Sequence, residues 1–337
     1  MQTYTSRSLL VALSLVVLPG LAGCGDSQGG TDSDSGETSE SGESDGTGDM
    51  LSPFSLQFAA SVDGQVVGCA DSITGLGLAG DITVGVSDLR FYISNLRFFD
   101  AGGSELAVEL DTNEFQYSSE AGDVALIDLT SNTEGTCADS AIAFAEGTSR
   151  TNAVITGMTA TDQVARVAFD VGVPQAVMKE TIANNTAEGA PSPLAEMYWS
   201  WASGYRHFVF NFAISNDGGE SGDGYIHIGS RDCAAEGFNA LEDRDSCGFV
   251  NTPTVTLDGF DLESGTVTLD IKAALAGLDF VVPILDPDTM EQIGEGPGVA
   301  CHSSPMQPDC AGVFSAFGLD QASGAASDAN NTAFTVM

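Results

Sequence analysis

The chain has 337 residues and a formal net charge of −38, with 10 Lys and Arg against 48 Asp and Glu. This negative field repels phosphate backbones, so the composition excludes nucleic acid as a partner and favours cations or basic surfaces. After the N-terminal leader no stretch is long and apolar enough to cross a bilayer, which argues against membrane-spanning helices.

The first residues have the pattern of an export signal. Arg7 precedes an apolar run over 9–17, and Leu21-Ala-Gly-Cys24 follows. A short basic region, an apolar stretch too short to span a membrane and small residues before the cleavage point predict a lipoprotein signal peptide over 1–23. Cys24 would then carry the lipid and anchor the protein to the membrane. An ordinary signal peptide with a coincidental cysteine is the alternative.

Residues 24–50 are predicted to be a tether. After Cys24 they are almost wholly Gly, Ser, Thr, Asp and Glu. Such a segment buries too little apolar surface to offset its chain entropy, so we expect an acidic disordered linker. The remaining residues, 51–337, have an acceptable length for one all-β domain.

Alternation of apolar and polar residues with a period of two dominates this domain. The clearest segments are 54–58, 164–169, 255–257 and 267–271. Turn-forming residues separate them, in a chain with 40 glycines. Helical periodicity is limited to 181–187 and 271–277. The pattern predicts an all-β fold, an antiparallel β-sandwich with few short helices and with disulfides.

Six cysteines remain when Cys24 is set aside, an even number that indicates disulfides in an exported chain. Short spacing favours two pairs and leaves a third, namely Cys233–Cys247, Cys301–Cys310 and Cys69–Cys137. A thiolate metal site is less favoured, because no Cys-x-x-Cys pair is present and the compartment is oxidising.

The segment 205–213 shows how a strand could present a site. Alternation places its side chains on two faces: Phe208, Phe210 and Phe212 on one, Tyr205, His207, Val209 and Asn211 on the other. We expect the phenylalanine face to be core and His207 to point away from it. His227 lies at the end of a second predicted strand and before Gly229, where a side chain can face a site.

Rare side chains gather between residues 191 and 233. Both tryptophans, Trp199 and Trp201, lie there with two of the three histidines. Copper(I) prefers thioether, thiolate and imidazole ligands. The candidate ligands are therefore His207, His227, His302, Met178, Met197 and Met306. The loop that a Cys301–Cys310 bond would close carries His302 and Met306 and could act as a clamp, although packing is the commoner role of a single methionine.

Catalytic patterns are absent, so we expect a binding protein and no enzyme. The chain has no G-x-S-x-G and no H-E-x-x-H, and its separated histidines offer no clear base. Two other classes stay open. One is a calcium-stabilised scaffold or a hydrolase, for which Asp286-Pro-Asp288 supplies oxygen ligands. The other is a surface interaction module in which the tryptophans are only core.

Several segments in order resemble one protein family. They are 89–97 (LRFYISNLR), 124–129 (VALIDL), 169–174 (FDVGVP), 191–205 (PSPLAEMYWSWASGY), 227–233 (HIGSRDC) and 301–303 (CHS). Together they resemble the MbnP-like copper-binding proteins, the four-cysteine partners of metallo-mystery pair systems, over about residues 53–320. The chain departs from that pattern at 175–179, which lacks the family's usual Asn-His, and at His207 and His302.

The resemblance implies an exported copper protein, on the periplasmic or outer-membrane surface of a bacterium. It implies copper acquisition or delivery, with copper bound as Cu(I). It also implies a di-haem, peroxidase-like partner that oxidises a tryptophan, here Trp199 or Trp201, to kynurenine near the metal. Convergence of His227 with a tryptophan and a second His or Met would support this function. Rings on opposite faces would leave only a scaffold.

Overall fold

Strands dominate the chain from Ser52 onwards, as the alternation of its apolar residues predicts. The structure is a computed structural model and describes residues 51–69, 71–130, 151–184, 190–200, 204–233 and 246–337. Within the chain, Thr47–Met337 forms one compact unit. The predicted leader and linker lie outside the described residues.

The larger of two sheets has 11 strands, and its main path runs β14-β10-β4-β12-β13-β18. Those six strands are β14 (Thr254–Asp258), β10 (Arg166–Val171), β4 (Ile82–Phe99), β12 (Gly204–Asn216), β13 (Ser221–Gly229) and β18 (Val299–Cys301). Shorter strands extend it, namely β3 (Ser72–Leu76), β5 (Glu105–Leu106) and β8 (Gly122–Asp128) on β4, β7 (Gln116–Ser119) on β8, and β11 (Tyr198–Ser200) on β12. Pairing along the main path is antiparallel except between β13 and β18, which run parallel.

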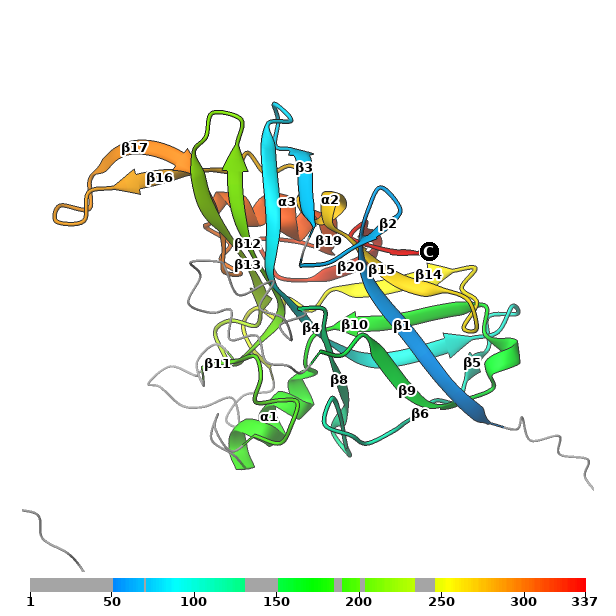
Figure 1. Cartoon of the computed structure of the whole chain (residues 1–337). Coiled ribbons are helices and arrows are strands. Elements are labelled where there is room, and N and C mark those ends of the chain that lie inside the picture. The colour runs from blue at the N-terminus through cyan, green and yellow to red at the C-terminus, as the bar shows by residue number, and fades with distance from the viewer. Residues whose placement is uncertain (1–50, 70, 131–150, 185–189, 201–203, 234–245) are drawn as a thin grey trace, which may run out of the picture. The chain divides into compact units, whose positions relative to one another are not determined.

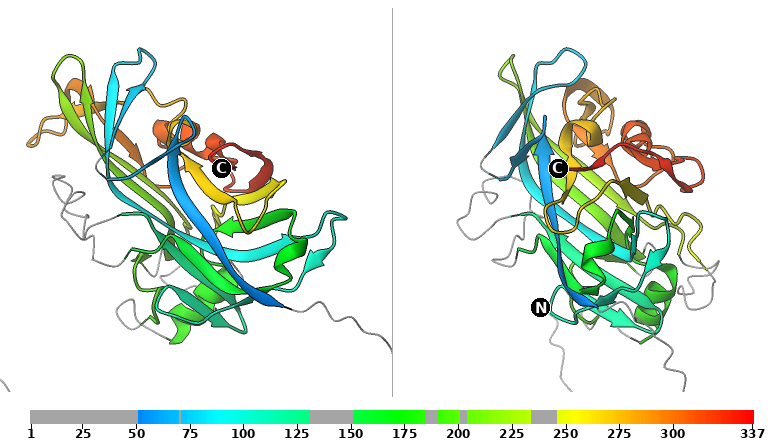
Figure 2. Two further views of the ribbon diagram at one scale, coloured as in Figure 1. Left: turned by 45° about the vertical axis from the view of Figure 1, so that its right-hand side comes forward. Right: turned by 90° about the vertical axis from the view of Figure 1, so that its right-hand side faces the viewer.

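The smaller sheet has six strands. They are β21 (Phe334–Val336), β15 (Thr266–Asp270), β1 (Ser52–Val62), β9 (Val154–Thr159) and β6 (Glu109–Leu110), with β2 (Gln65–Val67) paired to β1. Its central strand β1 runs parallel to β15 and antiparallel to β9. Figure 2, from two further directions, shows β1 lying across the strands of the larger sheet.

Phenylalanines form the core between the two sheets. Phe54 of β1 meets Phe98 of β4 edge-on, with ring centroids 5.2 Å apart. Phe58 of β1 contacts Phe91 of β4 in the same way, at 6.0 Å. Phe208, Phe210 and Phe212 of β12 belong to this core, as predicted. Such edge-to-face pairs stabilise beyond the area they bury, so this layer fixes how the sheets pack.

Smaller elements complete the unit. They are the strand pairs β16 (Val281–Leu285) with β17 (Gln292–Pro297) and β19 (Phe317–Leu319) with β20 (Ala326–Asn331), the 3₁₀ turn η1 (Thr161–Gln163), and the helices α1 (Gln175–Asn184), α2 (Ile271–Ala274) and α3 (Pro308–Ala316). Figure 1 shows the β16–β17 ribbon projecting beyond the larger sheet. Among the described residues no helix is long and apolar enough to span a membrane.

A second apolar cluster covers part of the outer face of the larger sheet. Tyr92 and Tyr205 belong to it and have fully buried side chains, together with residues from α1 and from 190–198. The Tyr92 hydroxyl donates to the carbonyl of Pro193 at 2.8 Å and accepts from the Met197 amide at 3.2 Å. These bonds tie the segment before Trp199 to the sheet.

The predicted sandwich class is therefore confirmed, and most predicted strands are present. The helix expected at 181–187 begins earlier, at Gln175, and that expected at 271–277 ends at Ala274. Helix α3 was not predicted. Its Pro at the first turn and Asp309 are ordinary start signals, but nine residues give too few turns for a clear apolar period.

Candidate metal site

His227 lies on the outer face of the larger sheet, opposite the Phe core. It pairs with Val209 across β13 and β12, and Val209 belongs to the outer cluster. The side chain is only 5% exposed. Its Nε2 lies 2.8 Å from Oδ1 of Asn211, the next residue of that face of β12.

His302 meets His227 because β18 runs parallel to β13. Ile226 pairs with Cys301, so the residues that follow each of them are neighbours. The two Nδ1 atoms are 3.1 Å apart and the ring centroids 4.8 Å. The two histidines therefore converge although 75 positions separate them in sequence.

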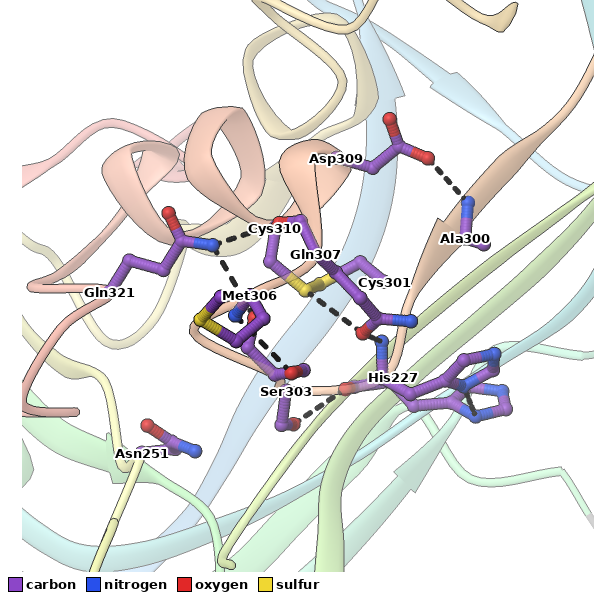
Figure 3. The surroundings of a disulfide bond; sticks show 12 residues. His227, Asn251, Ala300, Cys301, Ser303, Met306, Gln307, Asp309, Cys310 and Gln321 are labelled. Atoms are coloured by element: carbon purple, nitrogen blue, oxygen red, sulfur yellow. Dashed lines mark hydrogen bonds between the residues drawn. A yellow bond between two sulfur atoms is a disulfide. The ribbon is translucent and has the colours of Figure 1, made fainter. Parts of the chain in front are cut away.

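The loop that carries His302 is held at several points. The Cys301–Cys310 disulfide closes it over a separation of nine residues. The Ser303 hydroxyl donates to the His227 carbonyl at 2.7 Å and accepts from the Gly229 amide at 2.7 Å. Figure 3 shows the Ser303–His227 bond beside this disulfide. These bonds hold the loop, and with it His302, next to His227.

Both imidazoles are uncharged at neutral pH. Burial, followed by the neighbouring His302 and Arg206, lowers the pKa of His227 to about 3. The pKa of His302 is lowered by burial and then by Arg206. A metal ion binds neutral imidazole, so both rings have the protonation state that a metal would require.

The spacing of the two nitrogens suits one shared metal ion. Bonds of about 2.0–2.1 Å to a tetrahedral metal hold two nitrogens about 3.3 Å apart, and a wider bond angle separates them further. The Nδ1 atoms lie 3.1 Å apart, so the two imidazole rings need to move apart only slightly to admit an ion between them. Within the described part of the chain, no group of three His, Cys, Asp or Glu is placed to share a metal. Among the described residues, the pair alone could offer two nitrogen ligands to one ion.

Trp199 borders the histidine pair. Its ring is edge-on to His227 with centroids 6.4 Å apart. A surface pocket of about 340 Å³ is lined by Trp199, Arg231, His302, Ser304 and Gln307. The half-buried indole therefore lines the pocket and also contacts His227. Trp201, the other predicted modification candidate, lies outside the described residues.

The structure places His207 elsewhere. The β12–β13 register shifts between Arg206 and Phe208, so Arg206 pairs with Gly229 and His207 is the extra residue of a bulge. Its buried ring lies 3.1 Å, at Nδ1, from the Asn251 carbonyl. Burial lowers the pKa of His207 to about 4. Simple alternation did not foresee this bulge, and the expected position of His207 beside the site is corrected.

The candidate methionines do not line the pocket. Met178 and Met197 are fully buried in the outer cluster, where Met178 Sδ lies 3.6 Å from the Ser230 hydroxyl. Met306 is 86% exposed, in the loop after His302. The packing role accounts for the two buried thioethers.

Two of the three predicted disulfides lie wholly within the described residues, and both are present. Cys233–Cys247 and Cys301–Cys310 both form, as their short spacing predicts. The third predicted bond, Cys69–Cys137, involves Cys137, which lies outside the described residues. Asp286, considered for calcium, instead accepts hydrogen bonds from the amides of Asp288 and Thr289 in a turn.

Polar groups that the sequence did not single out support the site. Asp88 accepts two bonds from the Arg90 guanidinium, at 2.7 and 2.6 Å. Asp88 is opposite Asn211 in the pairing of β4 with β12. Strand alternation supplied one signal, since it placed Asn211 on the face away from the phenylalanines. Which residues of the neighbouring strands lie beside Asn211 could be known only from the order of strands in the sheet.

Known proteins resemble this chain in sequence and in fold. The sequence model of the MbnP family matches residues 51–291, well over half of the chain. The match includes Trp199 and His227 and ends before His302. The solved structure of MbnP from Methylosinus trichosporium is similar, with a TM-score of 0.59 and 22% identity over 85% of this chain and 98% of that chain. At this identity the likeness concerns the fold. No functionally curated protein matches.

Proposed function

This chain belongs to the MbnP family, and on that premise we propose that it binds one copper ion, as Cu(I), between His227 and His302. The observation that carries the proposal is the pair of facing Nδ1 atoms at 3.1 Å. Both rings have lowered pKa values, so at neutral pH each is an uncharged imidazole with one nitrogen lone pair. In this proposal the protein is exported, acquires or delivers copper, and has no catalytic role.

The ligands and their surroundings favour a singly charged ion. Imidazole binds copper well, and among the described residues no Asp, Glu or Cys is placed to complete a group of three ligands with the pair. Arg206 and Arg90 both act electrostatically on His227. Repulsion by a guanidinium grows with the charge of the ion, so it disfavours a divalent ion more than Cu(I). The net negative chain still attracts cations from a distance.

A titration tests the proposal. Cu(I) is added to the exported protein in competition with a chromogenic chelator, for wild type, His227→Gln and His302→Gln. We expect one equivalent to bind to wild type. Mutation of a residue that hydrogen-bonds to a metal ligand typically lowers metal affinity about 10–100-fold. Loss of a ligand itself, His227 or His302, should therefore lower it about 100-fold or more. Met306→Ala, an exposed residue of the same loop, should bind like wild type. Wild-type binding by both histidine variants would contradict the proposal.

The proposal extends to Trp199 as a substrate of a di-haem, peroxidase-like partner. Its indole lies edge-on to His227 and lines the neighbouring pocket. Oxidative opening of the indole would take its two oxygen atoms from two water molecules and release four protons and four electrons, and hydrolysis would then release formic acid and leave kynurenine. The haem partner would accept the four electrons and pass them to a peroxide, which is reduced to water.

Intact mass measures this modification. Co-expression with a di-haem partner should raise the mass of the exported protein by about 4 Da. The shift should vanish in Trp199→Phe and persist in Trp201→Phe. If the shift vanished in Trp201→Phe and persisted in Trp199→Phe, Trp201 would be the modified residue. An unchanged mass in every sample would reject the modification.

Association with the membrane rests on Cys24 in this proposal. A lipid on that residue and the acidic tether would leave the domain on the periplasmic or outer-membrane surface. Palmitate labelling of wild type, absent from Cys24→Ser, would support the anchor.

A further inference from the structure

We propose that Asn211 selects the tautomer of His227 that leaves its Nδ1 free for the metal, and the relevance to copper rests on the function proposed above. His227 Nε2 lies 2.8 Å from Asn211 Oδ1, and both side chains are buried, at 5% and 0% exposure. A carbonyl oxygen only accepts, so this bond requires the proton on Nε2. Neutral imidazole carries one proton, and Nδ1 is then a lone pair that points towards His302.

The neighbour of Asn211 on β4 fixes the orientation of its amide. Asn211 and Asp88 are directly opposite each other in the sheet, and such pairs have Cβ atoms about 4.5–5.5 Å apart. Asp88 is 2% exposed and carries a carboxylate. An amide NH₂ on that side faces a negative group, whereas a carbonyl oxygen there would be repelled. The carbonyl therefore belongs on the β13 side, against His227.

The orientation of the Asn211 amide decides which nitrogen of His227 carries the proton, and no hydrogen bond of Nδ2 to a described residue fixes that orientation. Nδ2 of Asn211 has no hydrogen-bond partner among the described residues. If the amide were reversed, Nδ2 would donate to His227 Nε2. The imidazole proton would then sit on Nδ1, the atom 3.1 Å from His302 Nδ1, and would block it. Asn211 is thus a positioning residue that acts through His227.

The same bond sets the state of His302 before copper arrives. With Nδ1 of His227 unprotonated, His302 donates its Nδ1 proton across the 3.1 Å contact. His302 lines the solvent-facing pocket, so this proton can move to its own Nε2 through water. The site then offers two Nδ1 lone pairs with no change in net charge.

Nitrogen NMR of the metal-free protein tests the tautomer without copper. The exported protein is labelled with ¹⁵N at histidine, and the three histidines are assigned with His302→Gln and His207→Gln variants. We expect His227 Nε2 to be protonated and Nδ1 to be bare in wild type. A proton on Nδ1 of His227 would overturn the proposal, whatever the copper titration shows.

Variants at Asn211 test the cause. Asn211→Leu removes the acceptor and should give mixed tautomers of His227 with a Cu(I) affinity about 10–100-fold lower. Asn211→Asp retains the acceptor and should keep the proton on Nε2. Tyr225→Phe is the matched control, since Tyr225 lies beside both histidine rings without a hydrogen bond to either. If folded Asn211→Leu, checked by its melting curve, keeps the wild-type tautomer, the proposed role of Asn211 is wrong. Absence of Cu(I) binding in wild type with the expected tautomer would instead reject the proposed function.

Discussion

Lowering the pH from 7 to 5 is expected to reduce the free energy of unfolding by about 2–3 kcal/mol. The cause is the pair of buried histidines, His207 and His227, which are 0% and 5% exposed. Urea unfolding of the metal-free protein at pH 7, 6 and 5 measures the change.

The sign follows from where the protons bind. Burial lowers the pKa of His207 to about 4 and that of His227 to about 3. In the unfolded chain both return to about 6.5, so below that pH the unfolded state takes up protons that the folded state does not. Each histidine then costs about 2 kcal/mol of stability by pH 5, and the loss continues until the pH passes the folded pKa.

Asp128 acts in the opposite direction. Burial raises its pKa to about 6, so the folded state gains this proton before the unfolded state does. Between pH 7 and 5 it offsets about 1 kcal/mol of the loss. A His227→Gln variant should therefore show a flatter pH dependence than wild type, whereas Asp128→Asn should show a steeper one. A stability that is constant from pH 7 to 5 in wild type would contradict the buried neutral state of the histidines.

The course of the strands could be predicted because each depends on local alternation. Segment 205–213 illustrates this, since its three phenylalanines face the core in the structure. The bulge at His207 is a property of two paired strands, and the alternation within one strand carries no sign of it. The sequence therefore predicted the strand correctly and misplaced one of its candidate ligands.

The convergence of His227 with His302 depended on the order of strands. Parallel pairing of β13 with β18 makes them neighbours, and no periodicity within either segment encodes that choice. The short Cys301–Cys310 spacing did predict the closed loop, and so placed His302 in a clamp. What remained hidden was the supporting bond from Asn211, because an asparagine facing away from the core has many ordinary roles.

Gly172→Ala is expected to lower the free energy of unfolding by about 4 kcal/mol. Gly172 belongs to the Gly-Val-Pro segment and has φ +145°, a conformation that residues with a Cβ rarely adopt. An added Cβ would lie 2.7 Å from the His207 ring. Strain at such a backbone costs about 1–3 kcal/mol and overpacking a further 1–3 kcal/mol.

Gly85→Ala supplies the matched control, because Gly85 lies in β4 and a Cβ there meets nothing within 4 Å. It should leave stability unchanged or raise it by up to about 1 kcal/mol. Urea unfolding at pH 7 compares the two variants with wild type. Since His207 lies outside the pair formed by His227 and His302, folded Gly172→Ala should still bind one equivalent of Cu(I). Equal stability of both glycine variants would show that the His207 ring can move aside and that the fold does not require glycine at position 172.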